Sequence, residues 1–151
     1  MSKISLFQQG FPLEKPNVIL AWNKPLSEVA QTSGGVWSSD RYMWKDVIYL
    51  NGLNYPLYSQ NGLDPKTPFT SISAYIGLTP KGLWSDEVVL MEYKKVANRL
   101  IEFFGQPQKI ELNPEVPGTE TLTWQFDKVE VCLDVIEQFS YKCYLTIGII
   151  K

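Results

Sequence analysis

The feature that most constrains the fold is the alternation of apolar and polar side chains through the last third of the chain. Apolar residues occupy every second position in segments near 121–126, 128–136 and 141–150. Successive side chains of a strand point to opposite faces, so each segment has one face that must be buried. Only short connections separate the three segments, which predicts an antiparallel meander.

A helix is expected just before this meander, over about 85–104. Ser85 can cap its first turn, and Gly105 is a typical residue at which a helix ends. Apolar side chains recur at intervals of four and three residues, so they form one stripe that faces a core. The members of this stripe are Val89, Tyr93, Val96, Leu100 and Phe103.

The first half of the chain repeats this order less clearly. A short helix is expected near 24–31, and Pro56 indicates that the strand around it lies at a sheet edge. Strands are predicted near 18–22, 43–50, 55–60 and 69–78.

The length of 151 residues is that of one domain. We therefore predict a single α+β domain over residues 1–151, with a twisted, mostly antiparallel sheet of about six strands and the long helix packed on one face. The order of a helix, three strands, a helix and three strands resembles that of small bacterial binding proteins, including toxin-neutralising immunity proteins and secretion chaperones. This likeness is one of architecture and carries no motif.

The chain contains no histidine. Catalytic triads built on an imidazole base are therefore excluded, as are zinc sites that need imidazole. The sixteen Asp and Glu residues are dispersed, and the sequence has no Cys-x-x-Cys, Walker loop, Rossmann fingerprint, EF-hand loop or nucleophile elbow. We expect a protein that is not an enzyme and binds neither a metal nor a cofactor. An enzyme that uses carboxylates or tyrosine is the open alternative.

Charge and hydropathy exclude further classes of partner. The formal net charge is −2 and the calculated pI is about 5.2, so the chain exerts no long-range attraction on nucleic acid or anionic lipid. Apolar runs are too short to span a bilayer or to form the core of a signal peptide. We expect neither nucleic acid nor membrane as a partner, and a cytoplasmic location.

The two cysteines are expected on opposite faces of the sheet. Cys132 alternates with the buried row of its segment, whereas Cys143 shares the parity of the buried row in the next segment. We predict two reduced thiols, with Cys143 in the core.

Twenty aromatic residues supply candidate contact sites. Trp37 lies in a small, polar loop over 32–40, where it could stack on a ligand, anchor a partner or close one end of the core. Trp44, Tyr49 and Tyr58 could line a concave surface if their strands curve away from the helix, although core packing explains them equally well.

Charged residues suggest two further surfaces. Glu130 and Asp134 lie on either side of Cys132, on the sheet face away from the buried row, where they either contact a partner or keep that face soluble. Lys94, Lys95 and Arg99 form a basic patch that could touch a phosphate or serve as the solvent face of the helix.

The leading hypothesis is a non-catalytic protein-interaction module whose partner is another protein. The alternative is a small-molecule carrier with an aromatic-lined pocket between sheet and helix. Strand 141–150 could also pair across the edge of a homodimer. The candidate binding residues are Trp37, Trp44, Tyr49, Tyr58, Glu130, Asp134 and Tyr144.

Overall fold

A computed structural model describes residues 3–60, 64–79 and 81–150. The helices are α1 (Lys3–Leu6), α2 (Leu26–Ser33) and α3 (Asp86–Phe104). The strands are β1 (Gly10–Leu13), β2 (Val18–Ala21), β3 (Val36–Ser38), β4 (Arg41–Trp44), β5 (Leu57–Ser59), β6 (Ser71–Ile76), β7 (Lys109–Leu112), β8 (Glu120–Phe126), β9 (Val129–Gln138) and β10 (Ser140–Ile149).

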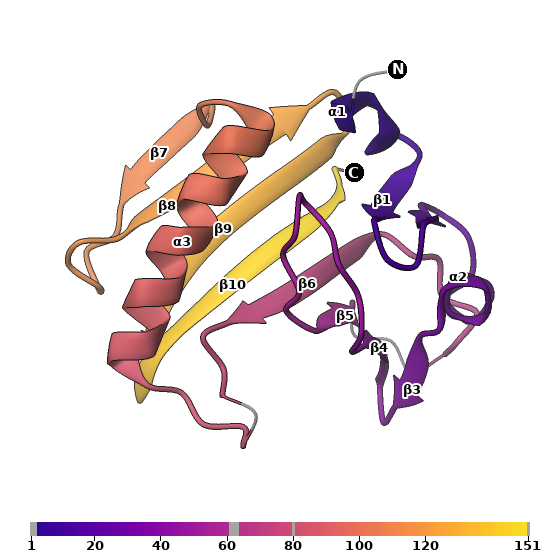
Figure 1. The fold of residues 1–151 in the computed structure, drawn as a ribbon, viewed down its shortest axis with the longest axis horizontal. Helices are drawn as coiled ribbons and strands as arrows, with labels where there is room; N and C mark the ends of the chain where they lie inside the picture. Colours follow the sequence, from indigo (N-terminus) through magenta and orange to yellow (C-terminus); the bar gives the residue numbers. More distant parts are fainter. Residues whose placement is uncertain (1–2, 61–63, 80, 151) are drawn as a thin grey trace.

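Eight strands form one antiparallel sheet in the order β3-β4-β5-β6-β10-β9-β8-β7, and β1 pairs with β2 in a separate hairpin (Figure 1). The predicted α+β class and antiparallel sheet are confirmed. The sheet is larger than the six strands expected, because the short end strands β3 and β7 were not predicted.

Each half of the chain has the same order of elements. Helix α2 is followed by β3 to β6, and α3 is followed by β7 to β10, so each helix precedes a meander of four strands. The two meanders join where β6 pairs with β10 in the middle of the sheet. Each half therefore contains one helix followed by four strands, rather than the helix and three strands that we predicted.

One face of the sheet is buried beneath α3, which contacts β10 and β6 and lies in front of β8 and β9 in Figure 1. The alternation predicted for β9 and β10 is confirmed, since the inward side chains from Val129 to Val135 and from Cys143 to Ile147 are all buried. Helix α3 contributes a buried stripe that ends at Phe104, whereas Phe103 is half-buried. Phe104 faces Phe126 of β8 at a ring-centroid distance of 5.0 Å, which explains the one-residue difference.

The ends of α3 follow the expected pattern in part. Ser85 is the N-cap residue, but its side chain makes no capping hydrogen bond. Gly105 ends the helix with φ of 87°, in the left-handed region that favours glycine. The backbone conformation at the C-terminal end of α3 therefore requires glycine, whereas the N-terminal end receives no hydrogen bond from the Ser85 side chain.

The prediction that Pro56 marks an edge strand is wrong. Strand β5 lies between β4 and β6, and Pro56 immediately precedes it without occupying a ladder position. The strand expected over 43–50 ends at Trp44, because the chain then leaves the sheet and turns through Leu50 and Asn51, both with positive φ. This turn lies against α3, where the Arg99 guanidinium donates to the backbone oxygen of Asn51.

The two cysteines are reduced and lie on opposite faces, as predicted: Cys143 is buried and Cys132 is half-buried. Within the described ranges, no helix combines the length and apolar character required to cross a bilayer.

Candidate functional site

The sheet has a second face, directed away from α3, which we call the outer face. Strand register places the alternate residues of neighbouring strands side by side on it. Every one of these side chains in the central strands keeps part of its surface exposed to solvent. They include Tyr58, Ser73, Tyr75, Thr121, Thr123, Cys132, Asp134, Ile136, Tyr144 and Thr146.

Four aromatic rings meet near the middle of the outer face, and we call them the aromatic cluster: Tyr58, Tyr75, Trp84 and Tyr144. Tyr75 is central, with its ring stacked on Tyr58 at a centroid distance of 4.5 Å and edge-on to Tyr144 at 5.4 Å. Trp84, from the segment before α3, completes the group at 6.0 Å from Tyr144. The rings hold one another in place, so they form a rigid, half-buried surface.

The aromatic cluster is packed because of the strand register. Tyr75 of β6 lies directly opposite Tyr144 of β10, and Tyr58 of β5 lies opposite Ser73, two residues before Tyr75. Large side chains at directly opposed and diagonal positions of antiparallel strands come into contact. Partial burial raises the pKa of the Tyr58 and Tyr144 phenols, so both stay neutral at physiological pH.

A cation lies on one side of the cluster. The Arg41 guanidinium donates to the Tyr75 hydroxyl at 2.8 Å and pairs with the Asp40 carboxylate at 3.0 Å. The hydrogen bond from Arg41 lowers the pKa of Asp40 below its ordinary value. Arg41 thus has a fixed position at the β4 side of the aromatic cluster.

Carboxylates lie on the other side. Asp134 of β9 is directly opposite Tyr144, and it accepts a hydrogen bond of 2.6 Å from the Thr121 hydroxyl. Asp134, Glu111 and Glu115 line an open hollow of about 310 Å³ at the β7–β9 end of the outer face, which we call the acidic hollow. In the part of the chain that the structure describes, no three acidic or cysteine side chains converge as metal ligands would.

Cys132 lies between the aromatic cluster and β8. Its burial and the nearby carboxylates of Asp134 and Glu130 raise the pKa of the thiol, opposed by a hydrogen bond with Thr123. A thiol with a raised pKa is a weak nucleophile. This arrangement gives no support to covalent chemistry at Cys132.

The outer face brings together four of the residues singled out from the sequence: Tyr58, Tyr144, Glu130 and Asp134. Trp44 and Tyr49 do not belong to it. Both side chains are fully buried, as the core-packing alternative expects. Tyr49 packs edge-on against Phe11 and donates its hydroxyl to the Tyr55 carbonyl oxygen at 3.0 Å.

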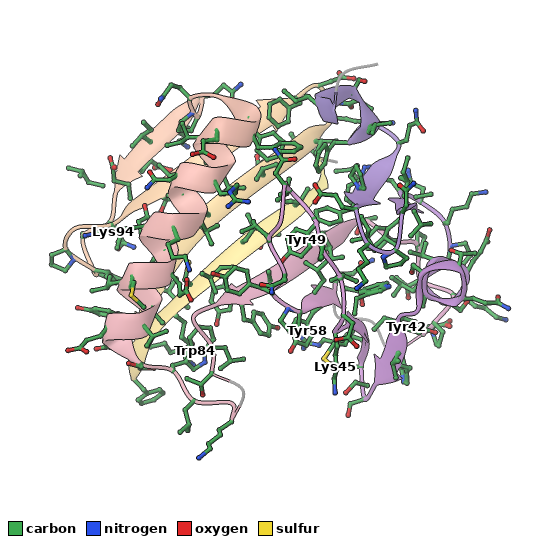
Figure 2. The ribbon with its side chains drawn as sticks, in the orientation of Figure 1. Tyr42, Lys45, Tyr49, Tyr58, Trp84 and Lys94 are labelled. Carbon is green, nitrogen blue, oxygen red and sulfur yellow. The ribbon has the colours of Figure 1, made fainter. Side chains whose placement is uncertain are left out.

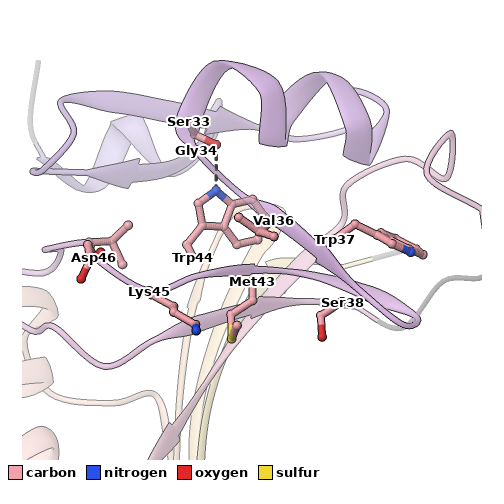
Figure 3. A pocket seen from close by; sticks show the side chains of 10 residues that line it. Ser33, Gly34, Val36, Trp37, Ser38, Met43, Trp44, Lys45 and Asp46 are labelled. Carbon is pink, nitrogen blue, oxygen red and sulfur yellow. Dashed lines mark hydrogen bonds between the residues drawn. The ribbon is translucent and has the colours of Figure 1, made fainter.

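Trp37 lies on the other side of β3, away from the outer face. It is half-buried and packs edge-on against Tyr42 at 4.9 Å, so it covers one end of the core. This is one of the three positions that the sequence left open for Trp37. An open cleft of about 520 Å³ lies beside it (Figure 3), where the Trp44 indole N–H donates to the Ser33 hydroxyl at 2.8 Å. A side chain at Gly35 would lie 2.7 Å from the Trp44 ring, which explains the glycine there.

The three cations of the predicted basic patch on α3 lie apart and contact different groups. Lys95 pairs with Glu92 at 3.3 Å, and Arg99 reaches the turn at Asn51 and Glu102. Lys94 lies apart, on the side of the helix that faces β7 and β8 (Figure 2). The three cations therefore do not converge on one anion site.

Sequence reasoning missed Tyr75, Trp84 and Arg41. Alternation within 71–76 carried a signal for Tyr75, since Ile72, Ala74 and Ile76 form the buried row and leave Tyr75 on the opposite face. Trp84 carried no such signal, because it lies outside any strand and its position depends on how the segment before α3 folds back.

Comparison of the chain with models of protein families, with curated protein sequences and with solved structures gave no significant match.

Proposed function

We propose that the protein is a non-catalytic interaction module and that the outer face is its contact surface for another protein. The observation that carries this proposal is the aromatic cluster, placed on the sheet face that stays accessible to solvent. Exposed groups of large apolar side chains on a folded domain are characteristic of contact surfaces.

The composition of the outer face supports the proposal. Tyrosine, tryptophan and arginine dominate the energetics of protein interfaces, and the cluster combines three tyrosines and one tryptophan with Arg41. Charged side chains such as Glu130 and Asp134 lie toward one side, as in the polar rim of an interface. The rings are already packed against one another, so little conformational entropy is lost on binding.

The carrier alternative has less support: the groove of about 420 Å³ between α3 and the β7–β8 strands is lined by a single aromatic ring, that of Tyr93. We therefore favour a protein partner.

Affinity capture with matched variants tests the proposal. The tagged protein is expected to retain a stoichiometric partner from native lysate, and the double variant Tyr58→Ala/Tyr144→Ala to lose it. Truncating a central aromatic side chain typically costs about 2 kcal/mol or more of binding free energy, which lowers affinity by more than about tenfold. The partner is identified by mass spectrometry, and binding is measured by titration.

The control variant is Met91→Ala, which removes an exposed apolar side chain from α3, on the other side of the sheet. It should retain the partner at the wild-type level. Circular dichroism should show that both variants remain folded. Equal partner recovery with the double variant and with wild type would refute the outer face as the contact surface.

A further inference from the structure

Charge is unevenly distributed across the outer face. Toward β7 to β9 the outward side chains include the carboxylates of Glu111, Glu130 and Asp134. Among the described residues of β7, β8 and β9, Lys109 is the outward-facing cation, and its ammonium group pairs with Glu111 at 3.5 Å. The side that adjoins Tyr144 is therefore acidic.

The acidic hollow concentrates this charge. Glu111, Glu115 and Asp134 line it, and its described lining includes neither lysine nor arginine. Burial raises the pKa of the neighbouring Cys132 thiol, and the negative charges of Asp134, Glu130 and Glu111 act in the same direction. An accessible depression of one sign attracts a side chain of the opposite sign.

Aromatic and acidic groups are adjacent at one point. Tyr144 and Asp134 are directly opposed on neighbouring strands, where side chains are separated by about 5 Å at their Cβ atoms. A guanidinium or ammonium group placed there touches an aromatic face and a carboxylate together, the pairing that such cations prefer. Besides Lys109, two cations of this chain face the same surface, Lys142 on β10 and Arg41 on β4, and Arg41 is paired with Asp40.

We propose that the partner of the outer face is a protein with a basic contact surface, which places an arginine or lysine side chain against Tyr144 and pairs it with the carboxylates of the acidic hollow. This inference rests on the proposed function and names the chemistry of the partner. Complementary charge of this kind speeds association and selects the partner, while the aromatic cluster provides most of the buried apolar area.

Binding of short peptides to the isotope-labelled full chain tests the inference by NMR. The probes are three capped hexapeptides in which threonine alternates with arginine, with glutamine or with glutamate. The arginine peptide is expected to shift the backbone amide signals around Thr121, Asp134 and Tyr144. The glutamine peptide should bind less tightly, and the glutamate peptide should leave these signals unchanged.

Matched charge variants separate a specific surface from general attraction. The triple variant Glu111→Gln/Glu115→Gln/Asp134→Asn should weaken the arginine peptide about fivefold or more, as expected for the loss of several exposed charge pairs. The control Glu28→Gln/Glu87→Gln/Glu102→Gln removes the same charge from the exposed helix surfaces and should change the affinity less than twofold.

Each alternative result is distinguishable. If the glutamine peptide shifts the same signals with equal affinity, the basic partner is refuted while the contact surface of the proposed function stands. If the arginine peptide shifts signals on α2 and α3 equally, the attraction is general and the inference fails. If raising the protein concentration alone shifts the outer-face signals, the occupant is a second copy of this chain. If no peptide shifts them, neither the inference nor the surface is supported.

Discussion

The free energy of unfolding is expected to fall steeply between pH 9 and 11. Cys143 and Tyr49 are fully buried, and burial raises the pKa of each above its ordinary value of 9.0 and 10.0 respectively. In the unfolded chain both groups lose their protons near those ordinary values, whereas in the folded chain they retain them. The unfolded state therefore binds fewer protons than the folded state above pH 9, and stability falls as pH rises.

The size of the effect follows from the same linkage. Each such group removes about 1.4 kcal/mol of stability per pH unit above its ordinary pKa. Over two units for Cys143 and one for Tyr49, the loss reaches about 4 kcal/mol by pH 11, a large part of the 5–15 kcal/mol that stabilises a typical domain. Burial also raises the pKa of Tyr55 and Tyr93, which acts in the same direction.

Urea unfolding at a series of pH values measures this loss. Between pH 6 and 8 the curve should be nearly flat, since the chain has no histidine. The variant Cys143→Ala should reduce the slope above pH 9 by about 1.4 kcal/mol per unit. A stability that stays constant to pH 11, or a slope unaffected by this variant, would show that the thiol is not buried as described.

Truncating Trp124 should cause a loss of similar size. Its side chain is fully buried against Phe104, and its indole N–H donates to the Gly105 carbonyl oxygen at 2.8 Å. The side chain thus links β8 to the end of α3 and satisfies one of the carbonyl groups that a helix end leaves unpaired. Trp124→Ala is expected to cost about 3–5 kcal/mol of unfolding free energy.

A second variant separates packing from the hydrogen bond. Trp124→Phe keeps most of the apolar volume and leaves the Gly105 carbonyl without this donor, so it should cost about 1–3 kcal/mol. Urea unfolding at pH 7 measures both variants. Equal losses for alanine and phenylalanine would mean that the hydrogen bond, rather than the packing, accounts for the effect of Trp124.

The sequence predicted those helices and strands whose pattern of apolar residues follows from the element itself having one buried face. Alternation in β9 and β10 needs only a strand with one buried face, and the stripe of α3 needs only a helix on a sheet. Strand β7 has no such pattern, because all four of its residues are exposed and it is a strand only through its pairing with β8. Local sequence could not indicate that pairing.

The candidate site was predicted in part, because strand alternation shows which face of the sheet a residue occupies. Tyr144, Glu130 and Asp134 follow from strand parity, which places them opposite the buried row. For Trp44 and Tyr49 the sequence left a contact surface and core packing open, because their burial depends on α2, β1 and the turn after Tyr49, which pack over the same sheet face as α3. Parity within a single strand gives the face of a residue but not what covers that face.

Site-specific photo-crosslinking in native lysate tests the contact surface most directly. A benzoylphenylalanine is introduced at Thr146, on the outer face beside Ser73 and close to the aromatic cluster, or at Asn98, exposed on α3. We expect one discrete adduct from Thr146, absent when Tyr58 and Tyr144 are both replaced by alanine, and none from Asn98. An adduct from Asn98 alone, or equal adducts from both positions, would contradict the outer face as the surface through which this protein acts.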